Sequence, residues 1–109
     1  MIGVFVTFRY GEKFDEQAMR KIAESARASF EGMPGLRSKA FTVNPEKREA
    51  TNFYIWDSGA AAKAFFTDAL LARITDLYGV RPCVEFVQIA TLVENISNPS
   101  RIAELARQS

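Results

Sequence analysis

The chain has 109 residues, of which 48% are hydrophobic, and these values fit one domain with a substantial core. Its 14 basic and 13 acidic side chains nearly cancel, so charge gives no reason to expect nucleic acid or a membrane as a partner. There is no histidine and a single cysteine, Cys83. These counts exclude Ser-His-Asp and Cys-His nucleophile systems, histidine-bound zinc or haem, and an intrachain disulfide. A lone cysteine favours a reducing compartment, and we expect a cytoplasmic protein.

The first half of the chain predicts a strand, a helix and two further strands. Alternating apolar residues predict the first strand over 2–9, which is too short and too interrupted for a signal peptide or a membrane span. Asp15 is a good helix N-cap, and apolar residues follow at helical spacing up to Gly32. Two more strands are predicted over 36–43 and 49–56, joined by a hairpin loop.

The second half predicts more helix and a last strand. Either residue of the pair 57–58 can cap a helix whose apolar pattern continues to Gly79, with residues 67–68 as a place where it could divide in two. Residues 81–93 predict a long strand, and the tail 97–109 predicts a short helix.

The element order is β-α-β-β-α-β, the ferredoxin-like split βαβ arrangement. We expect an α+β domain over 1–96, with a four-stranded antiparallel sheet and its helices on one face. The other face needs a cover, because an open sheet bearing Trp, Tyr and Phe would expose more apolar surface than monomers usually do. The long last strand and the apolar tail favour a second subunit, so we expect a homodimer.

The strand over 49–56 carries the most informative pattern. Asn52, Tyr54 and Trp56 share one face of it, since residues two apart in a strand point the same way. This face is aromatic with a hydrogen-bonding group on every member, which is typical of a small-molecule pocket. The alternative is the outer face of a half-buried sheet, where Tyr and Trp are common. The intervening residues are suited to an ordinary core: Thr51, Phe53 and Ile55.

Three segments resemble the dimeric α/β-barrel superfamily. Residues 33–41, Met-Pro-Gly-Leu-Arg-Ser-Lys-Ala-Phe, resemble its junction after the first helix. Residues 53–66, with Phe-Tyr-Ile-Trp-Asp-Ser before three alanines and Phe-Phe, resemble its third strand entering helix two. Residues 78–95, Tyr-Gly-Val followed by the last strand, resemble its closing strand. The resemblance covers about residues 1–96 and is nearest to the small "putative mono-oxygenases" related to the antibiotic-biosynthesis monooxygenase domain.

The resemblance implies a homodimer with two sheets face to face and, in each protomer, a pocket between sheet and helices. In the cofactor-independent members, an Asn and a Trp four residues apart line the active site, which implies catalytic roles for Asn52 and Trp56. Those members oxidise aromatic or quinol-like substrates with molecular oxygen and use no metal or flavin, so no cofactor is implied. The haem-degrading relatives use an axial histidine, which this chain lacks.

Other side chains could complete such a pocket. We expect five substrate-binding residues: Tyr54, Phe65, Phe66, Tyr78 and Arg81. Three basic residues are interpreted mainly as surface charge, although one or two could reach a pocket rim and offset an anionic ligand: Arg9, Arg37 and Lys39. Glu85 and Gln88 lie on opposite faces of the last strand, so at most one points inward, and Cys83 is expected to be inert.

The leading hypothesis is a homodimeric small-molecule-binding protein acting as a cofactor-independent mono-oxygenase on an aromatic or quinol-like substrate. A non-catalytic ligand-binding or dimerisation module is the alternative, because the sequence holds no acid–base pair at a diagnostic spacing. RNA binding through the same element order is a third hypothesis. It is disfavoured because the third strand lacks the Gly-Phe-rich pattern and the net charge is near neutral.

Overall fold

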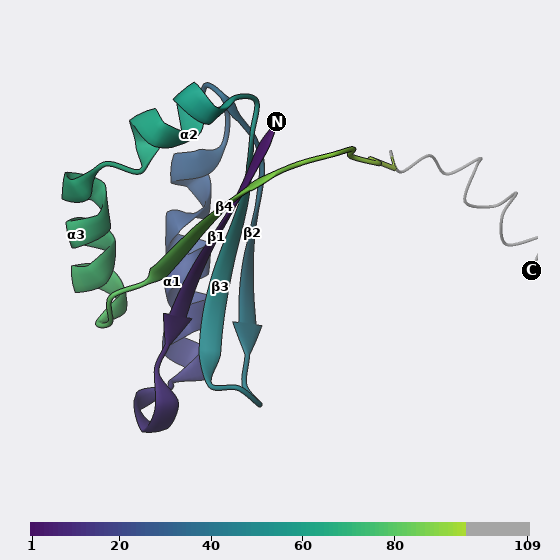
Figure 1. The fold of residues 1–109 in the computed structure, drawn as a ribbon. Helices are drawn as coiled ribbons and strands as arrows, with labels where there is room; N and C mark the ends of the chain where they lie inside the picture. The colour runs from purple at the N-terminus through teal and green to yellow at the C-terminus, as the bar shows by residue number, and fades with distance from the viewer. Residues whose placement is uncertain (96–109) are drawn as a thin grey trace, which may run out of the picture.

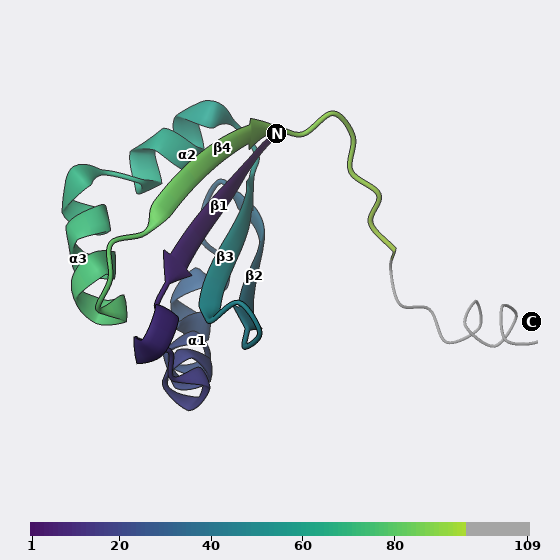
Figure 2. The same cartoon turned by 60° about the horizontal axis from the view of Figure 1, so that its bottom comes forward.

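The computed structural model of the chain describes residues 1–95. Its strands form one antiparallel sheet in the order β2-β3-β1-β4, and all helices lie on one side of that sheet (Figures 1 and 2). The predicted ferredoxin-like α+β arrangement is therefore confirmed. The elements are β1 (Ile2–Arg9), the 3-10 helix η1 (Gly11–Lys13), α1 (Glu16–Phe30), β2 (Leu36–Asn44), β3 (Glu49–Trp56), α2 (Gly59–Phe65), α3 (Asp68–Tyr78) and β4 (Cys83–Gln88).

Local capping chemistry explains where the helices begin and end. The Asp15 carboxylate accepts the Ala18 backbone N–H at 3.1 Å and starts α1. Ser58, not Asp57, caps α2. The Thr67 hydroxyl caps α3, so the predicted second helix is divided in two. Within residues 1–95, none of these helices has the length and apolar character needed to cross a bilayer.

The last strand is shorter than the sequence predicted. β4 covers Cys83–Gln88, whereas alternation indicated a strand over 81–93. β4 pairs only with β1, and its Gln88 already faces Ile2; the Ile89 N–H then donates to the Met1 carbonyl. Past that bond β1 offers no further backbone partner, so the strand ends and the chain runs past the sheet (Figure 1). The predicted C-terminal helix lies outside the described residues.

The core lies on the helix side of the sheet. Its fully buried side chains include Val4, Val6 and Phe8 of β1 and Tyr54 and Trp56 of β3. The alternation predicted for β3 is present, but the roles of its faces are reversed. The set interpreted as ordinary core, Thr51, Phe53 and Ile55, lies on the open side. The open side thus carries phenylalanine but neither Trp56 nor Tyr54, because alternation alone does not say which face the helices cover.

Candidate functional site

A cavity of about 350 Å³ lies between the sheet and the helices α1 and α3. Most of its wall is aromatic or aliphatic, from Phe30 on α1, Phe41 on β2 and Tyr54 on β3, with Phe65 of α2. Polar groups that line the same space include Lys39, Asn52 and the Tyr78 phenol, with Ser29 and Arg73 at exposed positions of α1 and α3. An apolar cavity with a few converging polar groups is the usual composition of a small-molecule site.

Asn52 and Tyr78 form the polar centre of the cavity. Asn52 is only 4% exposed, and its Nδ2 donates a hydrogen bond to the Tyr78 hydroxyl oxygen at 3.0 Å. Because that oxygen acts as acceptor, the phenolic proton stays available for a second partner. The bond joins two side chains that are 26 residues apart in the sequence.

Tyr78 is itself held firmly at the end of α3. Its ring stacks on Phe8 with centroids 3.8 Å apart, and its backbone carbonyl accepts the Tyr10 hydroxyl at 2.9 Å. Burial raises the pKa of Tyr78, although the Asn52 hydrogen bond opposes the shift. Burial also raises the pKa of Tyr54. Both phenols therefore keep their protons at neutral pH and can act as hydrogen-bond donors.

Lys39 lies inside a cage of aromatic rings. Its Nζ is 3.3 Å from the Phe30 ring centroid, 4.1 Å from that of Phe41 and 4.3 Å from that of Tyr54. Burial lowers the pKa of the Lys39 ammonium to about 7. The interpretation of Lys39 as plain surface charge is wrong, because the pairing Lys39↔Tyr54 turns its side chain toward the helices.

The other two basic candidates are surface charges, as expected. Arg9 pairs with Glu49 on the open side of the sheet, with two thirds of its side chain exposed. Arg37 pairs with Asp57 at 3.2 Å and lies 4.0 Å from Glu94. Neither lines the aromatic cavity.

Trp56 lies behind the cavity wall and does not line it. It is 1% exposed, its ring is nearly parallel to Tyr54, and Phe65 stands beside it with centroids 5.0 Å apart. Its indole Nε1 is buried and has no hydrogen-bond partner among the described residues. A buried indole N–H normally finds a partner, so this unpaired donor is an unusual feature. Phe66 also packs behind the wall, edge-on to Tyr54 and Trp56.

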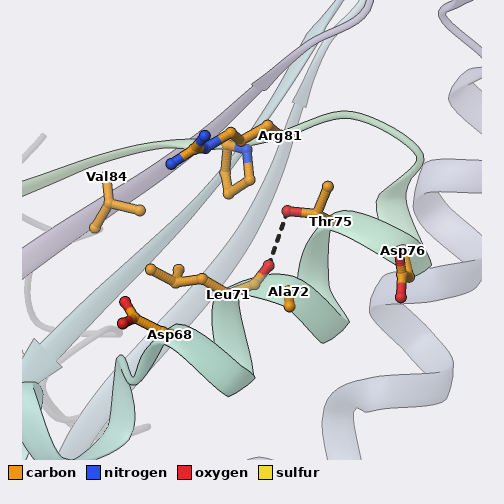
Figure 3. Close-up of a pocket in the computed structure, with 8 residues that line it drawn as sticks. Asp68, Leu71, Ala72, Thr75, Asp76, Arg81 and Val84 are labelled. Carbon is orange, nitrogen blue, oxygen red and sulfur yellow. Dashed lines mark hydrogen bonds between the residues drawn. The ribbon is translucent and has the colours of Figure 1, made fainter.

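Arg81 lies elsewhere, in a groove between α3 and the start of β4 (Figure 3). This hollow is larger, about 640 Å³, and is bordered by Asp68, Asp76 and Val84. Its charged side chains are exposed and remain hydrated, whereas the cavity around Asn52 offers buried polar groups in an apolar wall. We therefore assign the candidate site to the smaller cavity, on the opposite side of α3.

The remaining candidates on β4 do not reach this site. Cys83 and Glu85 lie opposite Thr7 and Phe5 on the open side, and both are exposed. Gln88 lies opposite Ile2, far along the strand from the cavity lining. Within residues 1–95, no three acidic or cysteine side chains gather in a way that could hold a metal ion.

The structure thus brings together four of the expected residues and adds one. Asn52, Tyr54, Phe65 and Tyr78 line one cavity; Trp56, Phe66 and Arg81 do not. Lys39 is the addition: its sequence context favours surface charge but allows a basic residue to reach the pocket rim, and it shares its strand face with Phe41. The Asn52–Tyr78 bond has no sequence signal, because its partners lie on elements that meet only in the folded chain.

The fold and the cavity define a small α+β protein with a candidate ligand site between a ferredoxin-like sheet and its helices. Residues 4–91 match the family described as "Putative mono-oxygenase ydhR", and the chain belongs to this family. Curated proteins compared by sequence give no match.

Solved structures share the fold at low sequence identity. A monooxygenase from the gene ActVA-Orf6 of Streptomyces coelicolor, in complex with Nanaomycin D, superimposes with a TM-score of 0.62 at 19% identity, over 87% of this chain and 92% of that one. A structure described as "Putative antibiotic biosynthesis monooxygenase" from Bordetella bronchiseptica superimposes with a TM-score of 0.63 at 17% identity, over 83% of this chain and 97% of that one. Rv0793 from Mycobacterium tuberculosis superimposes with a TM-score of 0.60 at 13% identity, over 85% of this chain and 98% of that one.

Proposed function

We propose that this protein is a homodimeric mono-oxygenase that binds a planar phenolic or quinol-like aromatic molecule in the Asn52 cavity and oxidises it with molecular oxygen, without a cofactor. The observation that carries the proposal is the cavity itself. It combines aromatic walls with a buried amide–phenol pair whose free proton can meet a substrate oxygen. Membership of a mono-oxygenase family supports the reaction class.

The ligand class follows from the shape and chemistry of the wall. Rings from Phe30, Phe41, Tyr54 and Phe65 border the space, which suits stacking and edge contacts with a flat molecule. A structural relative holds Nanaomycin D, which supports a small-molecule ligand in this fold. Tyr78 would donate to the substrate oxygen, and Asn52 would hold that hydroxyl in place. Trp56 would act indirectly, by supporting Phe65 from behind.

The proposed reaction balances without an external reductant. A phenol gives up its hydroxyl hydrogen and one ring hydrogen, and the substrate supplies all four electrons that reduce oxygen. One oxygen atom becomes the second quinone carbonyl, and the other leaves as water with the two hydrogens. Charge develops on the substrate oxygen when the phenol ionises, so a fixed donor such as Tyr78 would stabilise that state.

The dimer is proposed from the open side of the sheet. Phe5 and Phe53 stack at its centre with ring centroids 4.5 Å apart, and no helix of residues 1–95 covers them (Figure 2). The chain after Gln88 leaves its own sheet, and Val93 is 79% exposed there. A second copy of the chain would cover the phenylalanine pair and offer contacts for this departing segment, since a two-fold interface pairs the same patch with itself.

Oxygen uptake with anthrone and 1-naphthol tests the enzymatic claim. We expect wild-type protein to accelerate uptake and Tyr78→Phe to lower kcat/KM by roughly 100-fold, the usual effect of losing one fixed donor. Asn52→Leu should also lower kcat/KM, because it removes the amide that holds the Tyr78 hydroxyl in place. Trp56→Phe should have a smaller effect, and Lys63→Met, on the exposed side of α2, should have none. If wild type bound these compounds without any oxygen uptake, the proposed mono-oxygenase activity would be refuted, and the non-catalytic binding module would be the remaining hypothesis.

A further inference from the structure

The caged Lys39 is unusual because no acid within residues 1–95 shares its cavity. The charged or titratable groups that face the cavity come from three elements: Lys39 on β2, Tyr54 on β3, and Arg73 and Tyr78 on α3. α1 contributes only uncharged residues, Ala26, Ser29 and Phe30. Among the described residues, no carboxylate lines this space, and no ion pair includes Lys39.

An amine in this position has two usable protonation states. The ring faces of Phe30, Phe41 and Tyr54 attract the ammonium form, because the negative face of an aromatic ring favours a cation. Burial without a counter-ion favours the neutral form and brings the pKa of Lys39 to about 7. The neutral amine is therefore present near neutral pH. It can take the proton of a bound phenol because the phenolate then supplies the counter-ion that the cavity lacks, which offsets the difference of about three pKa units between a phenol and this ammonium.

We propose that Lys39 is the proton acceptor of this cavity: its neutral amine takes the O–H proton of a phenolic or enolic ligand and then remains beside it as the counter-ion. The inference rests on the proposed function in one respect, that the cavity binds an aromatic phenol. It adds a catalytic residue with a defined role. The O–H bond breaks, an N–H bond forms on Nζ, and the electron pair stays on the ligand oxygen as phenolate, which the Tyr78 hydroxyl can stabilise.

Two matched probes separate proton transfer from simple binding: 2-naphthol, and 2-methoxynaphthalene, which has no proton to give. At about pH 8 the free naphthol is protonated, as phenols are, and most of the Lys39 amine is neutral. We expect wild type to bind both probes and bound naphthol to show the naphtholate absorption band. Calorimetry in two buffers of different ionisation heat should detect no net proton release, because the proton moves within the complex.

The variants give opposite readouts. Lys39→Met should bind both probes without the naphtholate band and lose roughly tenfold in its preference for naphthol, which is equivalent to one pKa unit. Lys39→Arg keeps a fixed cation that cannot accept a proton. It should show the band and release about one proton per bound naphthol. Lys63→Met, a surface control, should behave as wild type.

The possible failures are distinguishable, and two need only wild-type protein. If wild type binds both probes with no naphtholate band, or releases a full proton when the band appears, Lys39 is not the acceptor and the proposed function still stands. A naphtholate band in Lys39→Met would lead to the same conclusion. If wild type binds neither probe, the aromatic cavity itself is misassigned, and both proposals fall together.

Discussion

The two sides of the sheet use the same strands for opposite purposes. On the helix side, β3 presents Asn52, Tyr54 and Trp56, and the covering helices enclose a cavity with polar groups inside. On the open side the same strand presents Phe53 against Phe5 of β1, bordered by the hydroxyl pair Thr7–Thr51. Burial therefore does not coincide with apolar character here, since the more deeply buried face carries the Asn52 amide. The Asn52 amide tolerates that position because it is paired with the Tyr78 hydroxyl, and the comparison separates the candidate site from the proposed interface.

The largest effect is expected at the base of the helix side. Trp56→Ala removes a fully buried indole and should lower the free energy of unfolding by about 3–5 kcal/mol. Trp56→Phe should cost clearly less, because the lost Nε1–H has no partner among the described residues. Urea unfolding at one fixed protomer concentration measures both. Equal losses for the two variants would mean that the indole N–H is bonded in solution.

The open side is tested by placing a charge at its centre. Phe53→Lys should weaken self-association by roughly 100-fold, as expected for the loss of a central aromatic anchor. Helix content should be preserved, because the helices cover the other side. Sedimentation over a range of concentrations measures this, and Gln17→Lys on the exposed surface of α1 is the matched charge control. A wild-type protein that sediments as a single chain at micromolar concentration would contradict the interface.

The polar centre of the helix side should show a smaller effect. Tyr78→Phe leaves the Asn52 amide N–H unpaired in a buried setting and should cost about 2 kcal/mol. Tyr10→Phe loses only a part-buried bond to the Tyr78 carbonyl and should cost less. Denaturant titration compares the free energies of unfolding of these two variants. The double variant Asn52→Leu with Tyr78→Phe, compared with its two single variants, measures the coupling energy between Asn52 and Tyr78. Additive losses would show that the pair does not interact in solution.

Lys39 should make stability depend on pH in a window set by its two pKa values. In the folded protein the pKa is about 7, against 10.5 for the unfolded chain, so between these values the unfolded state binds more protons. Stability should therefore rise with pH there, by at most about 1.4 kcal/mol per pH unit, relative to Lys39→Met. Below about pH 7 Lys39 is protonated in both states, so the full cost of burying its charge remains. Measurements should stop near pH 10, because tyrosines of the unfolded chain ionise there. The folded protein keeps the tyrosines whose pKa is raised by burial in their protonated form, and this would add a second pH dependence. If the difference in stability between wild type and Lys39→Met did not change with pH, the Lys39 amine would be hydrated in the folded protein.

Much of the fold could be predicted from local chemistry. Asp15 and Thr67 each accept the backbone N–H three residues ahead, and Gly79 adopts φ +81°, so these helix ends depend on neighbouring atoms alone. The strand alternation of 49–56 is equally local. The end of β4 could not be predicted in this way, because it depends on β1 having no residue left to pair with.

By itself, the sequence determined the element order, the helix caps and the grouping of Asn52, Tyr54 and Trp56 on one strand face, since each follows from spacing along the chain. Only the tertiary structure decided which face the helices cover, that Asn52 bonds Tyr78, and that Lys39 lies among three rings while Arg81 lies across α3. The physical reason is that these relations join residues from different elements, and their distances are set when the helices pack on the sheet.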